Sequence, residues 1–221
     1  MVAILTDTSN TTLYAKWNKV ENNNKPTTST TPTTPITMKF EDVKEKDWFY
    51  NAVKYTFTNG IIAGYNETTF APNDKLTRGM IVTILYRMEG SPNNNGKSKF
   101  EDVESNQWYS KAVKWAVDNG IVHGYGGTNK FGPNDNIIRQ DLAGILRNYA
   151  GYKKKNVKTT ASLAKFKDNN QVDSYAKTSM EWAVGTGVIT GNADGTLNPK
   201  GNATRAEAAA MITKYCDKVG R

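Results

Sequence analysis

Asn-Gly-Ile-Val-His-Gly-Tyr at residues 119–125 is the stretch that decides the fold, because versions of it stand at two other places in the chain. Residues 59–65 read Asn-Gly-Ile-Ile-Ala-Gly-Tyr, and residues 186–192 read Thr-Gly-Val-Ile-Thr-Gly-Asn. A proline follows each copy, and an arginine stands six residues after each proline, at Arg78, Arg139 and Arg205. Recurrence at a fixed spacing indicates one supersecondary unit that is used several times.

The repeat also extends toward the N-terminus. Phe-Glu-Asp-Val at residues 40–43 recurs at residues 100–103 and, as Phe-Lys-Asp, at residues 166–168. Two aromatic residues seven positions apart then follow in each copy: Trp48 and Tyr55, Trp108 and Trp115, Tyr175 and Trp182. We therefore divide most of the chain into repeat 1 (39–91), repeat 2 (99–152) and repeat 3 (165–221).

The aromatic pair predicts the first helix of each repeat. In repeat 2, Trp108, Ala112 and Trp115 fall at i, i+4 and i+7, which places them on one helix face. Glycine is the residue that most easily takes the left-handed conformation at a helix C-terminus. We therefore expect these helices to end at Gly60, Gly120 and Gly187.

The arginine motif opens the second predicted helix of each repeat. Thr204 and Glu207 form a capping box, which is incomplete in the other repeats because Met80 replaces the acid and Ile138 replaces the threonine. An apolar stripe with helical spacing follows the motif in every repeat. One repeat is too small to bury both its helices, so we predict a mainly α, pseudo-threefold body with these three helices at its centre. Turns and short extended segments connect the helices.

The first 38 residues differ from the repeats. Residues 1–20 end in Leu-Tyr-Ala-Lys-Trp, which alternates as a strand does. We interpret this segment as the end of a small β-repeat, similar to the internalin type, or as a disordered tail. Residues 21–38 are rich in Thr and Pro and predict an extended linker. Residues 1–5 lack the basic start of a signal peptide, so we expect the chain to be a fragment of a longer protein.

Composition limits the possible partners. The formal net charge of +8 favours anionic partners such as a cell-wall polymer, nucleic acid or a membrane surface, and it serves solubility equally well. No apolar run approaches the roughly 20 residues that cross a bilayer, so we expect no membrane insertion. Cys216 is the only cysteine, and we interpret it as a small filler of the last helix rather than a reactive thiol. A single histidine, His123, cannot complete an ordinary zinc site with it.

The ordered motifs resemble the S-layer homology (SLH) domain, present as a set of three over about residues 39–217. The features that carry the resemblance are the Phe-x-Asp opening, the aromatic helix, the Gly-Ile-Ile/Val-x-Gly-Tyr turn, the Phe-x-Pro-Asn segment and the Thr-Arg-Ala-Glu signature. The resemblance implies a module that attaches bacterial surface proteins to the cell wall without a covalent bond. It also implies a Gram-positive type of cell surface, an extracellular location, and grooves between lobes that bind an anionic secondary cell wall polymer, often a pyruvylated glycan.

The resemblance gives the arginine of the Thr-Arg-Ala-Glu motif the role of meeting the ketal carboxylate, which carries over to Arg78, Arg139 and Arg205. A helix N-terminus and a planar guanidinium both suit an anion. The alternative is that these arginines bind structural carboxylates. We favour the ligand role, because the arginine is kept in all three copies while its neighbours vary.

Other candidate ligand-binding residues stand near the arginines in the motifs. Trp48 and Trp108 could stack on sugars, although core positions are the better interpretation for these helix members, and Tyr65 and Tyr125 are the better candidates for exposed platforms. The turn glycines permit either close approach of a ligand or only a tight turn. The full set of further candidates is Gly64, Gly124, Gly191, Tyr65, Tyr125, Trp48, Trp108, Asp42 and Asp102.

No catalytic arrangement is visible in the sequence. Glu41 and Asp42 are adjacent carboxylates that point apart, whereas glycosidases need two carboxyl groups that face one bond. A nucleophile with a histidine base and a phosphate-binding glycine loop are also missing. We therefore predict a binding module without enzyme activity, metal or cofactor. The competing interpretations are a protein–protein scaffold and a nucleic-acid-binding surface; scattered lysines and the lack of an arginine-rich helix argue against nucleic acid.

Overall fold

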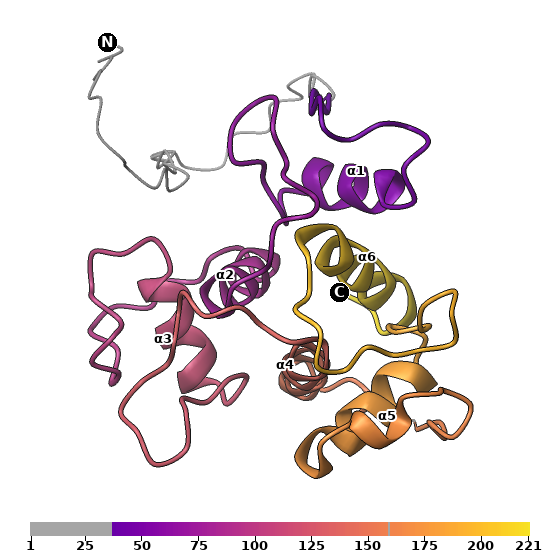
Figure 1. Ribbon diagram of the computed structural model, residues 1–221. Helices are drawn as coiled ribbons and strands as arrows, with labels where there is room; N and C mark the ends of the chain where they lie inside the picture. Colours follow the sequence, from indigo (N-terminus) through magenta and orange to yellow (C-terminus); the bar gives the residue numbers. More distant parts are fainter. Residues whose placement is uncertain (1–36, 159) are drawn as a thin grey trace. The chain divides into compact units, whose positions relative to one another are not determined.

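The computed structural model describes residues 37–158 and 160–221 and shows a mainly helical protein, as predicted (Figure 1). The first helices of the repeats are α1 (Tyr50–Thr58), α3 (Ser110–Asp118) and α5 (Lys177–Gly185), and the second helices are α2 (Arg78–Met88), α4 (Arg139–Tyr152) and α6 (Arg205–Lys218). Two short 3-10 helices, η1 (Asn169–Gln171) and η2 (Ser174–Ala176), precede α5. The predictions for residues 1–20 and for all but the end of the linker lie outside the described residues.

Each first helix begins two residues after the first aromatic residue of its repeat. Trp48 precedes α1, and Trp108 precedes α3. The prediction that Trp108 lies on the face of a helix was therefore wrong, because the helical spacing continues one turn upstream of the helix itself. The predicted C-terminal glycines are confirmed, since Gly60, Gly120 and Gly187 have φ angles of 67°, 66° and 78°.

The second helices have the caps that the motifs predict. In α6, the Thr204 side chain accepts the Glu207 N–H and the Glu207 carboxylate accepts the Thr204 N–H, which completes a capping box. In α2, Thr77 accepts the Met80 N–H but no acid returns the bond. Helix α4 has no side-chain cap at Ile138. Repeat 3 therefore has the only complete capping box of the three.

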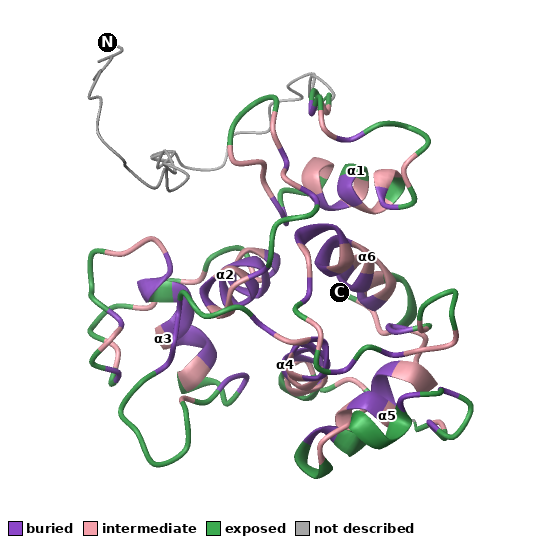
Figure 2. Ribbon diagram, viewed as in Figure 1, coloured by how far each residue is buried: buried purple, intermediate pink, exposed green. Residues whose placement is uncertain are grey.

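The second helices lie innermost, and α1, α3 and α5 lie outside them (Figure 1). Figure 2 shows that the inner helices are largely buried. Near the ends of α4 and α6, the rings of Tyr149 and Tyr215 pack with centroids 5.4 Å apart, and both residues are fully buried. Among the described residues, extended backbone pairs only in isolated bridges near the starts of the inner helices, and each bridge joins two repeats. The predicted central helices are confirmed.

The helices that pack together come from different repeats. Helix α3 of repeat 2 packs on α2 of repeat 1, and α5 of repeat 3 packs on α4 of repeat 2. Helix α1 of repeat 1 packs on α6 of repeat 3, which closes the cycle between the first and last repeats. Each lobe therefore combines the second helix of one repeat with the first helix of the next repeat in the cycle. Each second helix is packed against the first helix of another repeat, so we expect the three repeats to fold together.

Candidate ligand-binding site

Each inner helix begins with its arginine, as predicted, and the arginine side chain reaches into the next repeat. Arg78 of repeat 1 donates from Nε to the Phe131 carbonyl at 2.8 Å and from Nη2 to the His123 carbonyl at 2.9 Å, both in repeat 2. Arg205 of repeat 3 makes the two equivalent bonds to repeat 1, each at 2.8 Å. The arginines therefore join neighbouring repeats in the same cyclic order as the helices.

Arg139 of repeat 2 departs from this pattern. Its Nε donates to the Leu197 carbonyl of repeat 3 at 2.9 Å, as the other arginines do. Its Nη1, however, pairs with the Glu207 carboxylate at 2.7 Å. The other two arginines have no such partner on the neighbouring inner helix. For Arg205 the residue in place of Glu207 is Met80. For Arg78 it is Asp141, which accepts the Tyr175 hydroxyl and shows no ion pair with Arg78.

These bonds give the arginines a structural role, which was the alternative left open by the sequence, although most of their partners are backbone carbonyls rather than carboxylates. Arg139 and Arg205 are only 6% and 5% exposed, and burying such a cation is costly unless it is hydrogen-bonded. The presence of arginine in all three copies therefore has a cause in the fold itself, and it does not by itself indicate a ligand. A guanidinium has five N–H donors, so the bonds to the fold leave others for a ligand.

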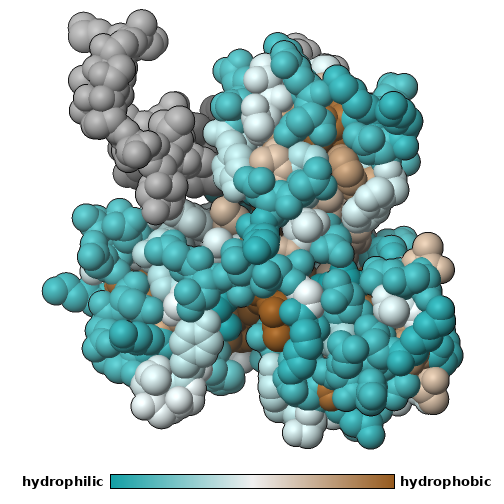
Figure 3. All heavy atoms as spheres, viewed as in Figure 1, coloured by the Kyte–Doolittle hydropathy of each residue, from teal (hydrophilic) through white to brown (hydrophobic). Residues whose placement is uncertain are grey.

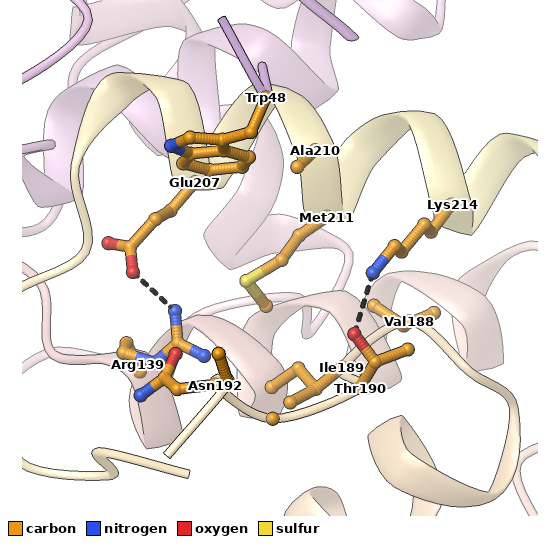
Figure 4. A pocket seen from close by; sticks show the side chains of 12 residues that line it. Trp48, Arg139, Val188, Ile189, Thr190, Asn192, Glu207, Ala210, Met211 and Lys214 are labelled. Atoms are coloured by element: carbon orange, nitrogen blue, oxygen red, sulfur yellow. Dashed lines mark hydrogen bonds and ion pairs between the residues drawn. The ribbon is translucent and has the colours of Figure 1, made fainter. Parts of the chain in front are cut away.

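A cavity of about 430 Å³ lies beside Arg139, and all three repeats contribute to its walls (Figure 4). Repeat 1 contributes Trp48, repeat 2 contributes Arg139, and repeat 3 contributes the turn around Gly191 and one side of α6. Met211 supplies an apolar wall, while Arg139 and Lys214 lie on opposite sides of it (Figure 4). We call these residues the 139 site. An apolar surface with a few polar groups is the usual form of a small-ligand site.

The 139 site has an excess of positive charge. Lys214 donates to the Thr190 hydroxyl at 2.9 Å, and the pKa of its amine is lowered by burial and then by the nearby charge of Arg139. Glu207 is the one carboxylate among the described residues that line the cavity; it pairs with Arg139 and also caps α6. The described lining therefore has two cations but only one carboxylate, and that carboxylate pairs with Arg139. An anion bound near both cations would be stabilised by each of them.

Trp48 extends from the turn before α1 and is 69% exposed. Its ring packs edge-on against Phe49, with centroids 5.4 Å apart. The interpretation of Trp48 as a core residue was therefore wrong; Tyr175, at the equivalent position of repeat 3, is likewise 68% exposed. Trp108 is half-buried. An exposed indole at the edge of a polar cavity suits stacking on the apolar face of a sugar.

The equivalent positions in the other repeats form two more candidate sites. The 205 site contains Arg205, which lies over the Tyr65 ring at 4.5 Å from its centroid. The 78 site contains Arg78, which lies over the Tyr125 ring at 4.8 Å. Of these two predicted platforms, Tyr65 is half-buried and Tyr125 is 42% exposed. Asn192 replaces the tyrosine in the 139 site, and in the part of the chain that the structure describes no ring lies over Arg139.

The remaining candidates hold the repeats together internally. A Cβ at Gly64 or Gly124 would collide with the Phe40 or Phe100 ring of the same repeat, and Gly191, at φ 80°, meets Phe166 in the same way. The structure thus favours the tight-turn interpretation of these glycines. Gly191 also lines the cavity.

The two predicted aspartates are also occupied within their own repeats. Asp42 accepts the Phe70 and Ala71 N–H groups at 2.9 and 2.6 Å. Asp102 accepts the equivalent N–H groups of repeat 2 at 2.8 and 2.7 Å. Both aspartates fasten the opening of the repeat to the segment before the proline, and we assign them no contact with a ligand.

Comparison with known proteins agrees with the threefold organisation. The S-layer homology domain matches the chain at residues 39–79, 99–143 and 165–209. The chain belongs to the S-layer homology family. It is 31% identical over 82% of its length to an amylopullulanase from Thermoanaerobacterium thermosulfurigenes, of which it covers 10%. It is 28% identical, also over 82% of its length, to an S-layer protein from Bacillus thuringiensis subsp. finitimus, of which it covers 22%.

SLH membership identifies the chain as a cell-surface anchoring module, and the SLH domain itself is non-catalytic. The chain spans a fifth or less of the first three curated relatives that it matches. Within residues 37–158 and 160–221, no helix is long and apolar enough to cross a membrane, and no group of three metal-ligating side chains comes together.

The motifs of this SLH triplet did not identify two residues of the 139 site, Lys214 and Glu207, as candidate site residues. Lys214 stands nine residues after the arginine that opens α6, and Arg87 occupies the same position in repeat 1. Alignment of the repeats could have revealed this second basic position. The position does not stand out in the repeat pattern because repeat 2 has Asn148 there.

Proposed function

We propose that this SLH triplet anchors its parent protein to the cell surface by binding an anionic secondary cell wall polysaccharide. The 139 site receives an acidic substituent of the glycan, such as the carboxylate of a pyruvate ketal. The observation that carries the proposal is the arrangement of the cavity, which Arg139 and Lys214 line together with one carboxylate and the exposed ring of Trp48.

The chemistry of the 139 site suits such a ligand. A guanidinium presents its donors in a plane that matches a carboxylate, and a charge-assisted hydrogen bond contributes about 1.5–3 kcal/mol. The contacts of Arg139 to Leu197 and Glu207 hold the guanidinium in place before the ligand arrives. Preorganisation of this kind reduces the entropy lost on binding. Trp48 then offers a flat apolar surface for the sugar ring.

The form of the site favours a glycan over the competing partners. A cavity of about 430 Å³ falls in the range of small-ligand sites, at about 300–1,000 Å³, which suits one or a few sugar units. On the face shown in Figure 3, hydrophilic residues predominate and apolar patches are small. This differs from the apolar centre of an obligate protein interface.

Binding to isolated wall sacculi tests the proposal. We expect the chain to sediment with intact sacculi and to remain in solution with sacculi from which the secondary polymer has been removed chemically. The released polymer, added in solution, should compete for the chain, whereas polymer with its acidic substituents removed should compete poorly. Equal sedimentation with intact and stripped sacculi would contradict the proposal.

A further inference from the structure

The three equivalent sites differ in a second basic position on the inner helix, nine residues after its first residue. In the 139 site this position is Lys214 on α6, and in the 205 site it is Arg87 on α2. In the 78 site it is Asn148 on α4, whose side-chain amide donates to the Ile121 carbonyl at 3.1 Å. The 78 site therefore has a neutral side chain, already bonded to the turn, where the other two have a cation.

Lys214 and Arg139 line the same cavity, and Arg87 holds the equivalent position on α2 relative to Arg205. The pKa of Lys214 is lowered by burial and then by the charge of Arg139. In the same way, the pKa of Arg87 is lowered to about 10 by burial and then by the charge of Arg205. Two like charges held close together make a place where a bound anion is stabilised by both.

The acidic residues increase the difference between the sites. In the 78 site, Asp141 accepts the Tyr175 hydroxyl, and Asp135 accepts the hydroxyl of Tyr125, the ring that Arg78 covers. Asp141 occupies the position of Glu207 in the 139 site and of Met80 in the 205 site.

The 139 and 205 sites have fewer carboxylates. The counterparts of Asp135 are Asp74 in the 205 site and Gly201 in repeat 3. The negative charge of Asp74 favours the charged form of Arg205 and so raises its pKa. The aspartate of the Phe-x-Asp opening is present in all three repeats and does not distinguish the sites. Apart from that shared aspartate, and counting only side chains within residues 37–158 and 160–221, the 139 and 205 sites each have two cations and one carboxylate, whereas the 78 site has one cation and two carboxylates.

We infer that the 139 and 205 sites bind the acidic group of the glycan and that the 78 site does not. The second cation, Lys214 or Arg87, selects an anionic ligand, while Arg78 serves only to join repeats 1 and 2. The inference rests on the proposed function and specifies which sites perform it. It assigns a role to two residues outside the family's arginine motif.

Isothermal titration with a monovalent probe tests the inference. The probe is a methyl hexoside that carries a 4,6-pyruvate ketal, and its uncharged methyl ester is the control ligand. We expect two equivalents of the ketal acid to bind per wild-type chain, and the ester to bind at least tenfold more weakly. Three equivalents, or one, would overturn the inference and leave the proposed function standing. A wild-type chain that binds no ketal acid would overturn both.

Exchange of the second basic residue between the sites gives a matched set of variants. Lys214→Asn and Arg87→Asn each copy the residue of the 78 site, and each should weaken binding at one site by about ten- to a hundredfold. Asn148→Lys combined with Asp141→Asn should add a third equivalent. Melting temperatures would verify that each variant is folded. Two unchanged equivalents in both single variants would show that the second cation does not select the ligand.

Discussion

Replacement of Trp48 by Ala separates ligand binding from stability better than replacement of an arginine does. The arginines join the repeats, so their loss is expected to affect folding and binding together. Trp48 lies at the edge of the 139 site with 69% of its surface exposed, so most of its side chain lies outside the core. A role in binding should therefore appear with almost no change in the free energy of unfolding.

The expected loss of affinity follows from the exposed area of the ring. An aromatic side chain has about 150–250 Å² of surface to bury, so Trp48 has on the order of 100 Å² or more that is open. A sugar on one face would cover roughly 60–80 Å². At about 25 cal/mol per Å², this contact contributes about 1.5–2 kcal/mol, or about ten- to thirtyfold in affinity. The small buried part should keep the loss of stability below about 1 kcal/mol, a few degrees in Tm.

The assay is titration calorimetry with the pyruvylated hexoside, accompanied by thermal unfolding. Tyr175→Ala is the matched control, because Tyr175 holds the equivalent position beside the 78 site and is similarly exposed at 68%. We expect weakened binding at one site in Trp48→Ala and unchanged binding in Tyr175→Ala. Unchanged affinity in Trp48→Ala, or a fall in Tm that accounts for the whole loss, would refute the stacking argument.

Three further predictions concern the arginines, the centre of the fold and pH. Arg139→Ala should lower both glycan affinity and Tm, because it breaks the bonds to Leu197 and Glu207. Arg139→Lys should restore each only in part, because lysine lacks the planar guanidinium. A normal Tm with lost affinity would show that the bonds to the fold contribute little to stability. Glu89→Ala should cost about 1–3 kcal/mol, several degrees in Tm, because it removes the acceptor of the fully buried Tyr149 hydroxyl and the partner of Lys153, and calorimetry should show normal glycan binding. Lys214 must be protonated to attract the anion, and its pKa is lowered below the ordinary lysine value of 10.5. The affinity of the 139 site should therefore be highest below that lowered pKa and should fall as the pH rises through it. A titration series on Lys214→Arg should lack this decrease.

The helices and their ends were predictable from the sequence because each depends on short-range physics. The apolar stripes of the inner helices, the left-handed glycines such as Gly60 and the capping box of Thr204 act within a few residues of one another. The starts of the outer helices were placed too early. The helical spacing includes Trp48 and Trp108, but the backbone becomes helical only two residues later.

The pairing of helices across repeats could not be predicted from the repeat pattern. A periodic sequence looks the same whether a first helix packs on the second helix of its own repeat or of the preceding one. The packing of α1 on α6 reveals the second arrangement, and it joins segments about 150 residues apart in the chain.

The candidate site was predicted in part. Arg139 and Gly191 line the cavity as the motif suggested, but the carbonyl partners of the arginines are backbone groups that no side-chain pattern records. Lys214 is not part of the repeated motif, because this position differs among the three repeats. Such variation is what makes the three sites differ.

The most direct test of the central claim is the crystal structure of the chain with the pyruvylated hexoside bound. We expect the ketal carboxylate in the cavity of the 139 site, within hydrogen-bonding distance of Arg139 and Lys214, with the sugar ring against Trp48. A ligand bound with its carboxylate in solvent, or bound only elsewhere on the protein, would contradict the claim that Arg139 and Lys214 together anchor the glycan.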